Sequence, residues 1–258
     1  MFGPLNPPMR DWTGRCVWVI GGTAGIGRAT AQELHRRGAQ LAVSGRSEAA
    51  LQAFRDEHPG SLGFALDVGD AGSVRLAADR VMRSLGVPDL VLYSAGHYAP
   101  TSALHFDLAA MLLHERVNYT GALHVLDAVL PSLIAARRGH ISLVGSVAGY
   151  RGLPRALAYG PTKAALHHLA EILWLDLRET GIGVSIVNPG FVATRLTAQN
   201  DFAMPALLRP EEAAREILAG WQRGRFDIDF PRRFTIWLRL LSVLPPRWHF
   251  AAVRRFAP

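Results

Sequence analysis

The chain of 258 residues contains a single cysteine, Cys16. One cysteine cannot form a disulfide framework or a metal site built from several thiolates. The proline-rich opening, Met1–Arg10, has no apolar run long enough for a signal peptide. No uncharged apolar stretch reaches the roughly 18 residues that a bilayer-spanning helix needs. These absences lead us to expect a cytoplasmic protein that does not cross a membrane.

Charged residues are few, at 19%, while hydrophobic residues reach 49%. This composition can bury a sizeable core, which excludes a disordered or fibrous protein. The net charge of +7 is unevenly distributed, because residues 231–258 hold six arginines and no acidic residue. Residues 1–230 therefore carry 7 − 6 = +1. A nearly neutral body does not indicate nucleic-acid binding, and the sequence has no motif that reads nucleic acid.

Lysine is almost absent as well. Of the 28 basic residues, 27 are arginine, and the one lysine is Lys163. A GC-rich genome would explain the bias toward arginine, but it would not explain why this position differs. A site that needs a compact ammonium, where a planar guanidinium does not fit, would explain it.

Apolar runs of strand length alternate with helix-patterned segments along the chain, which is typical of βαβ units and a parallel sheet. The runs predict strands at Cys16–Ile20, Gln40–Ser44, Leu62–Leu66, Leu90–Ser94, His140–Val144, Gly183–Val187 and Phe226–Phe230. Helices are predicted near residues 26–37, 47–57, 70–85, 105–136, 155–180 and 210–222. We therefore expect an α/β fold: one doubly wound Rossmann-type domain over residues 1–230, with a mostly parallel seven-stranded sheet. Residues 231–258 form a separate basic, aromatic tail.

A glycine-rich turn, Gly21-Gly22-Thr23-Ala24-Gly25-Ile26-Gly27, joins the first predicted strand to the first predicted helix. Glycine permits positive φ and lets backbone N–H groups approach a pyrophosphate. Tight turns without a ligand use glycine too, but this place in an α/β chain favours a nucleotide site.

The second predicted strand ends at Gly45-Arg46. Proteins that select NAD usually place Asp or Glu here to bind the ribose hydroxyls. Gly45 offers no carboxylate, and Arg46 offers a guanidinium suited to a 2′-phosphate. The position favours NADP(H) over NAD(H), although a solvated arginine opening the next helix would look the same.

Tyr159 and Lys163 lie four residues apart, on one face of a predicted helix. Ser146 comes thirteen residues earlier, just past a strand that ends at Val144. Open α/β sheets bind ligands at this carboxyl edge. A phenol, an ammonium and a hydroxyl can therefore meet at one site.

With Asn118 and Asn188-Pro189-Gly190, these motifs resemble the short-chain dehydrogenase/reductase family over roughly residues 12–230. The resemblance implies hydride transfer between a nicotinamide and a carbonyl or secondary alcohol. It also implies a catalytic set of Asn118, Ser146, Tyr159 and Lys163. The implied cofactor-binding residues are Gly21, Thr23, Gly25, Ile26, Gly27, Arg46, Asp67, Val68, Ala95, Gly96, Tyr159, Lys163, Pro189, Gly190, Val192 and Thr194.

The resemblance also assigns roles to the catalytic set. Tyr159 would exchange the proton, and Lys163 beside it, with the oxidised nicotinamide, would lower the pKa of the phenol. Lys163 would also hold the nicotinamide ribose. Ser146 would position the carbonyl, and Asn118 would anchor a water that relays protons through Lys163.

Three positions depart from the family pattern. Ile20 replaces a usual threonine before the first glycine, and Tyr93 and Ser94 stand where two asparagines are common. The hydrogen bonds of those amides must be supplied differently. We expect these changes to affect cofactor affinity more than the chemistry.

The loops after the strands, residues 97–104, 150–157 and 191–209, supply the substrate side and are largely apolar, with Phe202 among their aromatics. They favour an apolar carbonyl compound, whether lipid-like, steroid-like or aromatic, over a sugar. The predicted pocket residues are His97, Leu153 and Phe191, although His97 could also be a plain loop histidine. The spacing of the ten histidines suggests no metal site.

The tail combines helically spaced apolar residues with arginines from Arg232 to Leu244, and Pro245-Pro246 should end that helix. Trp248, Phe250 and Phe256 follow. This pattern suits peripheral contact with the inner face of a membrane, or packing on the core or another subunit. Family resemblance suggests a homodimer or homotetramer formed through helices 105–136 and 155–180. A non-catalytic NADP(H) sensor and a membrane-surface scaffold remain as alternatives.

Overall fold

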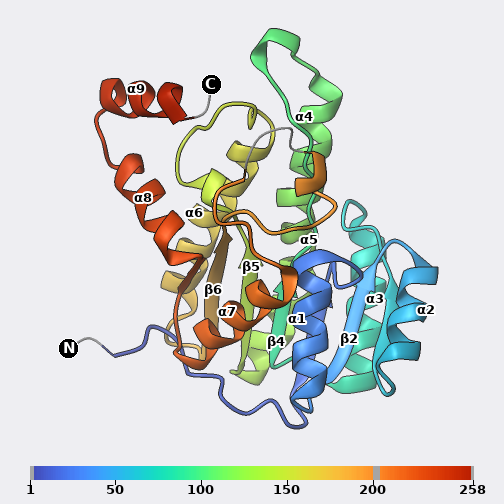
Figure 1. Ribbon diagram of the computed structural model, residues 1–258. Helices are drawn as coiled ribbons and strands as arrows, with labels where there is room; N and C mark the ends of the chain where they lie inside the picture. The colour runs from blue at the N-terminus through green and yellow to red at the C-terminus, as the bar shows by residue number, and fades with distance from the viewer. Residues whose placement is uncertain (1–2, 200–203, 257–258) are drawn as a thin grey trace.

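The computed structural model describes residues 3–199 and 204–256, built around one seven-stranded sheet (Figure 1). Every neighbouring pair of strands is parallel, in the order β3-β2-β1-β4-β5-β6-β7. The strands are β1 (Cys16–Ile20), β2 (Gln40–Gly45), β3 (Leu62–Ala65), β4 (Leu90–Tyr93), β5 (Gly139–Val144), β6 (Ile182–Pro189) and β7 (Asp227–Phe230). Every strand end lies within two residues of its predicted position. The predicted doubly wound α/β fold is confirmed.

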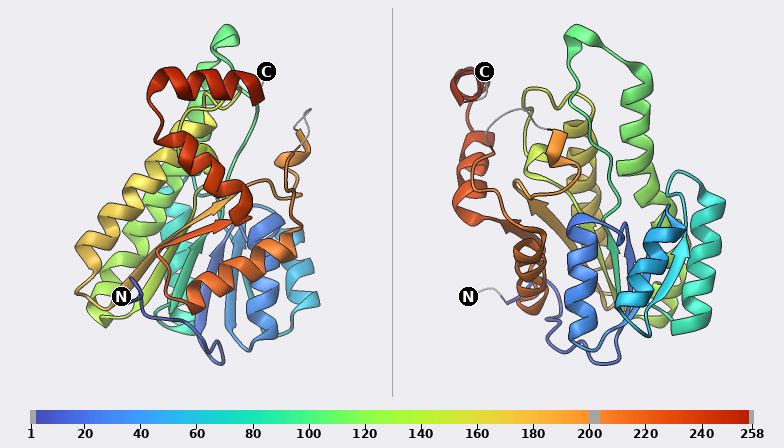
Figure 2. Two further views of the ribbon diagram at one scale, coloured as in Figure 1. Left: turned by 60° about the vertical axis from the view of Figure 1, so that its left-hand side comes forward. Right: turned by 45° about the vertical axis from the view of Figure 1, so that its right-hand side comes forward.

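Helices cover both faces of the sheet (Figure 2). On one face lie α1 (Gly25–Arg36), α2 (Glu48–Glu57) and α7 (Pro210–Gln222). On the other lie α3 (Ala71–Leu85), α5 (Gly121–Ala136) and α6 (Tyr159–Leu177). The strand order reverses between β1 and β4, so a crevice opens at their carboxyl ends.

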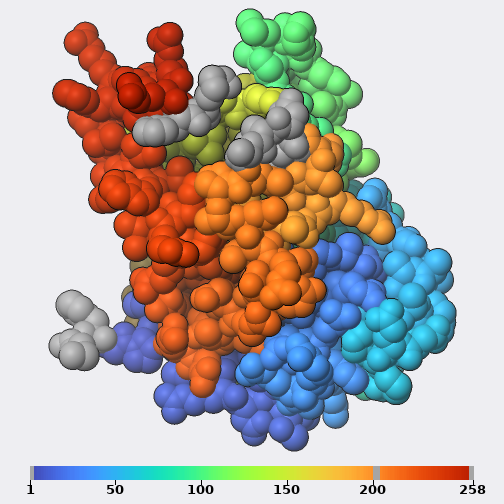
Figure 3. Space-filling view, in the orientation of Figure 1, coloured from blue at the N-terminus to red at the C-terminus, as the bar shows by residue number. Residues whose placement is uncertain are grey.

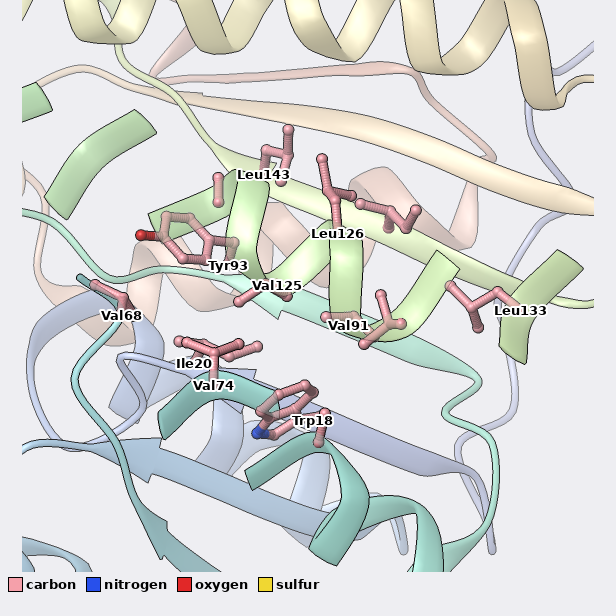
Figure 4. Close-up of a cluster of buried hydrophobic side chains, with 14 of the residues drawn as sticks. Trp18, Ile20, Val68, Val74, Val91, Tyr93, Val125, Leu126, Leu133 and Leu143 are labelled. Atoms are coloured by element: carbon pink, nitrogen blue, oxygen red, sulfur yellow. The ribbon is translucent and has the colours of Figure 1, made fainter. Parts of the chain in front are cut away.

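The strands are apolar on both sides because both sides are covered. In β1, Val17 and Val19 join the core beneath α1 and α7, while Trp18 and Ile20 join the core beneath α3 and α5. Figure 4 shows the second of these cores, with Trp18 and Ile20 beside side chains of α3 and α5. Burial on two faces is the physical reason for an unbroken apolar run rather than an alternating one.

The helix predicted over residues 105–136 is divided in the structure. A 3₁₀ turn, η1 (Ala103–His105), precedes α4 (Leu108–Glu115), and a π-helical turn, η2 (Arg116–Thr120), joins α4 to α5. Taken together, Leu108–Ala136 is the one helical run in the described part of the chain that is long and apolar enough to cross a membrane. The sequence excluded such a span because charges interrupt every apolar stretch. In the fold, α5 contributes side chains to the core against the sheet, which accounts for its apolarity.

The helix predicted over residues 155–180 begins later, at Tyr159. Arg155 has a φ of 59°, and Ala156 forms a bridge with Thr101, so these residues cannot join the helix.

The tail folds as two helices, α8 (Arg232–Ser242) and α9 (Pro246–Phe256). The sequence predicted the first helix and its end but no helix beyond Pro246. Proline ends a helix that precedes it, yet it also suits the first position of the next one. The division at residue 230 stays a prediction.

Candidate active site

The turn between β1 and α1 has the shape of an anion cradle. Gly21 and Gly25 have positive φ values of 82° and 54°. A Cβ on Gly21 would lie 2.5 Å from the backbone nitrogen of Ala95, and a Cβ on Gly27 would lie 2.3 Å from the oxygen of Gly21. Backbone atoms cannot move aside, so these positions require glycine. No side chain caps the start of α1, which leaves its N–H groups available to a pyrophosphate.

The end of β2 lies next to this turn. A Cβ on Gly45 would come within 2.8 Å of the Thr23 hydroxyl, so Thr23 occupies the space that an acidic side chain would enter. Arg46 is exposed and lines the same cleft. A phosphate beside Arg46 would therefore meet a guanidinium and no carboxylate from position 45.

Ser146 and Tyr159 come together at the carboxyl edge of the sheet. The Ser146 hydroxyl accepts a hydrogen bond from the backbone nitrogen of Ala148 at 3.1 Å, which fixes it at the start of a 3₁₀ turn. Its interaction with the phenol of Tyr159, the first residue of α6, favours the ionised form of that phenol. Burial raises the pKa of Tyr159 to about 12, and the interaction with Ser146 opposes that shift.

Lys163 is buried one turn further along α6. Its Nζ donates a 2.7 Å hydrogen bond to the carbonyl oxygen of Val144 and lies 5.5 Å from the centre of the Tyr159 ring. Burial lowers the pKa of Lys163 to about 7. The sequence predicted that Lys163 would lower the pKa of Tyr159. That prediction also involved the oxidised nicotinamide, and it stays a prediction; in the chain alone, removal of the phenol from water raises the pKa.

The order of these features along one parallel sheet agrees with a family model. A model described as short chain dehydrogenase matches residues 15–204. The chain belongs to the short-chain dehydrogenase/reductase family. Members of this family use an NAD(P)-type nucleotide, and the glycine cradle before α1 fits the pyrophosphate of such a nucleotide.

Curated relatives agree with this family. An uncharacterized oxidoreductase of Myxococcus xanthus (strain DK1622) is 36% identical over 251 residues, covering 96% of this chain and 99% of that protein. The unmatched 4% of 258 residues is about ten, fewer than the 28 residues of the tail, so the match extends into the tail. Dehydrogenase/reductase SDR family member 7B of Mus musculus is 29% identical over 191 residues, covering 70% of this chain and 58% of that protein.

Solved structures share the fold. The crystal structure described as ribose-5-phosphate isomerase from Brucella melitensis 16M is 28% identical with a TM-score of 0.77, covering 85% of this chain and 92% of that one. The structure of gox2181 is 23% identical with a TM-score of 0.77, covering 90% of this chain and 98% of that one, and shows the fold alone.

Asn118, expected on a long continuous helix of this dehydrogenase/reductase, lies in the π-helical turn η2 and is fully buried. Its side chain accepts a 2.7 Å bond from the backbone nitrogen of His97 and donates to the carbonyl oxygen of His97 at 3.0 Å. It also donates to the hydroxyl of Thr162, which the sequence analysis missed. Asn118 thus joins the loop after β4 to α6. Tyr93 supports the same turn, because its hydroxyl donates to the carbonyl oxygen of Val117.

A cleft of about 1080 Å³ unites the predicted residues. Gly27 and Asn118 are buried and are not among the residues that line it. The cleft is lined by the remaining predicted residues: Gly21, Thr23, Gly25, Ile26, Arg46, Asp67, Val68, Ala95, Gly96, Ser146, Tyr159, Lys163, Pro189, Gly190, Val192 and Thr194. The three predicted substrate-pocket residues His97, Leu153 and Phe191 line it as well. Phe202 lies outside the described residues.

Tyr98 and the predicted residue His97 shape the substrate side of the cleft. Tyr98 places its ring against Tyr159, with centres 5.1 Å apart, and also lines the cleft. Burial lowers the pKa of His97, and His114 and Arg46 add to that shift. Both residues lie in the loop after β4. Within residues 3–199 and 204–256, no cluster of His, Cys, Asp and Glu side chains could hold a metal ion.

A polar chain that the sequence did not indicate runs from α6 to the tail. His167, four residues after Lys163, bonds Asn188 at 2.6 Å, and Asn188 donates to Asp227 at 3.1 Å. Arg239 of α8 then pairs with Asp227 and donates to the Tyr150 hydroxyl at 3.0 Å. The tail is therefore joined by hydrogen bonds to the helix of Tyr159.

Proposed function

We propose that this protein is an NADP(H)-dependent oxidoreductase that interconverts a carbonyl group and a secondary alcohol on an apolar substrate. The observation that carries the proposal is that Ser146, Tyr159 and Lys163 meet in the wall of one cleft, with the Lys163 ammonium 5.5 Å from the centre of the Tyr159 ring. When bound, the nicotinamide nucleotide would supply or accept the hydride.

Tyr159 is the proton donor for carbonyl reduction in this proposal. A pKa near 12 keeps its phenol protonated at neutral pH, so Tyr159 can donate a proton to the oxygen of a carbonyl that is being reduced. Ser146 would hold the same oxygen through its hydroxyl, which Ala148 already orients. These groups favour reduction near neutrality.

Lys163 and Asn118 would return the proton to Tyr159. Because burial lowers the pKa of Lys163 to about 7, its ammonium can lose and regain a proton near neutrality. Asn118 fixes the backbone of His97, donates to Thr162 of α6, and would position a relay water. Lys163 would also hold the hydroxyls of the nicotinamide ribose.

The preference for NADP(H) rests on the end of β2. Thr23 fills the space beside Gly45, and Arg46 is exposed at the cleft. A guanidinium binds a 2′-phosphate through charge-assisted hydrogen bonds, and no acidic side chain at position 45 repels it.

The substrate class rests on the apolar side chains of the cleft beyond Ser146 and Tyr159. Leu113 comes from α4, and the others come from the segments that follow β5 and β6: Val147, Leu153, Pro154, Phe191 and Leu196. Such a wall favours a lipid-like, steroid-like or aromatic carbonyl compound over a sugar.

The test is NADPH oxidation with a panel of apolar ketones and aldehydes, comparing the wild type with Tyr159→Phe. Loss of the proton donor should lower kcat by about 10²–10⁴-fold and leave NADPH affinity unchanged, because only the hydroxyl is removed. Tyr119→Phe makes the same change outside the cleft and should retain activity. Full activity of Tyr159→Phe would contradict the mechanism, and tight NADPH binding without turnover on any carbonyl would favour a non-catalytic sensor.

A further inference from the structure

The tail presents an apolar surface to solvent. Five large apolar side chains of α8 and α9 are exposed, with Trp237 and Trp248 at 68% and 70%, and so is Val243 between the two helices. We call this surface the tail face: Ile236, Trp237, Leu240, Val243, Trp248 and Phe250. Its α8 members recur at helical spacing, so they share one side of that helix. Figure 3 shows α8 and α9 at one corner of the molecule, projecting from its body.

The exposed charges of α8 and α9 have one sign. Arg232, Arg233, Arg247, Arg254 and Arg255 are exposed, and α8 and α9 contain no acidic residue. Arg239 differs, since it points inward to Asp227. The surface of a soluble protein rarely combines a continuous layer of negative charge with an apolar layer directly below it. An anionic lipid bilayer offers both.

The inner side of the tail is fixed to the substrate side of the site. Arg151 donates to the carbonyl oxygens of Ser242 and Leu244, and the His249 ring lies 3.3 Å from the carbonyl oxygen of Gly152. These contacts come directly before Leu153, which lines the cleft. These hydrogen bonds therefore fix the position of the tail helices relative to the loop that forms part of the cleft wall.

A second apolar prominence lies at the same end of the molecule. The segment from η1 to the start of α4 projects beyond the carboxyl ends of the strands, as α9 does (Figures 1 and 2). It exposes Leu104, Phe106 and Leu108, with Leu104 at 87%. Since this segment follows His97 and Tyr98 of the cleft, apolar surface flanks the cleft from two sides.

We propose that the tail face is a docking surface for an anionic lipid membrane, which holds the open end of the cleft toward the bilayer. Tryptophans with arginines suit the boundary between headgroups and acyl chains. One consequence rests on the proposed function: an apolar carbonyl compound dissolved in the bilayer would lie close to the cleft of the membrane-bound protein.

The experiment is flotation of the full chain with vesicles of phosphatidylcholine containing phosphatidylglycerol, or of phosphatidylcholine alone. We expect binding to the anionic vesicles, weaker binding at about 1 M salt than at about 0.1 M, and a blue shift of tryptophan emission. Arg247→Glu with Arg254→Glu should lower the partition coefficient by more than about tenfold. Trp237→Ser with Trp248→Ser should lower it independently.

The matched control is Arg80→Glu with Arg83→Glu on α3, which changes the net charge by the same amount from exposed positions away from the tail. It should leave vesicle binding intact. Absence of binding to anionic vesicles, or equal loss in the α3 control, would overturn the proposal. A tryptophan variant that lowers the oligomeric mass in solution without lowering vesicle binding would assign the surface to a second copy of the chain. All variants should retain carbonyl reduction of a water-soluble ketone. Loss of vesicle binding can therefore be distinguished from loss of the proposed enzymatic activity.

Discussion

Lys163 occupies a space that suits a slender cation. Its side chain is 3% exposed, and its Nζ reaches the carbonyl oxygen of Val144 at 2.7 Å. Gly149, in the 3₁₀ turn after Ser146, lets that turn approach α6 closely. A Cβ on Gly149 would lie 2.7 Å from the carbonyl carbon of Lys163. A planar guanidinium is bulkier and does not lose its proton near neutrality. These two properties separate lysine from the arginine found at every other basic position.

Lys163→Arg should therefore inactivate the enzyme even though it keeps the charge. We expect kcat/KM for carbonyl reduction to fall by more than about 100-fold, because the guanidinium neither fits nor exchanges a proton near neutral pH. Steady-state kinetics measures the loss, and thermal unfolding reports whether the fold survives. Lys163→Met, which removes the charge but keeps a slender chain, separates fit from charge. Near-normal activity of the arginine variant would refute the size argument.

Arg46→Ala tests cofactor choice at the residue scale. Loss of charge-assisted bonds to a 2′-phosphate should weaken NADPH binding by about 10- to 100-fold. NADH lacks that phosphate, so its affinity should change by less than about threefold. Fluorescence titration of both cofactors measures the ratio. An unchanged ratio would leave Arg46 as a solvated residue at the start of α2.

At the scale of elements, a buried polar network joins β5, β6 and α7. His140 of β5 bonds the hydroxyl of Ser185 on β6 at 2.8 Å, and Ser185 donates to Ser142 at 3.0 Å. The indole N–H of Trp221 on α7 donates to both serines. Burial lowers the pKa of His140 from 6.5 to about 4, because the charged imidazolium would lose its hydration.

This network predicts how stability depends on pH. His140 binds a proton near pH 6.5 in the unfolded chain but only near pH 4 in the folded chain. Above about pH 6.5 the imidazole is neutral in both states, so protonation does not reduce the free energy of unfolding. It should fall by up to about 3 kcal/mol as the pH drops toward 4. Denaturant unfolding at pH 7 and pH 5 should show this slope, reduced in His140→Gln. His168→Gln, at an exposed histidine, is the control and should keep the slope.

The strands and the central site residues could be predicted because each leaves a local signal. Burial on both faces gives apolar runs, and Gly21, Ser146, Tyr159 and Lys163 have fixed spacings. The π-helical turn could not be predicted, because a changed hydrogen-bond register hardly alters the apolar pattern. The bond between Arg239 and Tyr150 was also missed, since it joins residues 89 positions apart. Long-range partners of this kind are set by the sheet and not by the neighbouring sequence.

At the scale of the whole molecule, α4, α5 and α6 leave large apolar side chains uncovered. These are Leu112, Leu123, Ile134, Ile172 and Leu175. We infer that these helices join copies of the chain into a homodimer or homotetramer, because association would remove this apolar surface from water.

Leu123→Glu combined with Leu175→Glu should therefore lower the molecular mass in solution, as measured by light scattering during size-exclusion chromatography. Burying two carboxylates in an apolar interface is unfavourable, so association should weaken strongly. Leu76→Glu on α3, at a position 50% exposed, is the control and should leave the mass unchanged. A wild-type chain that is monomeric at micromolar concentration would refute the inference.

The pairing of Arg239 with β7 has an evolutionary consequence. Asp227 and Asp229 both lie within 4 Å of this one guanidinium, and α8 also supplies the Thr235 hydroxyl that donates to Asp229. A lineage that lost the tail would leave these two carboxylates without their cation. Asp227 is connected to α6 through Asn188 and His167, and His167 lies four residues after Lys163. The tail and the acidic pair of β7 should consequently be inherited or lost together, as one unit of descent.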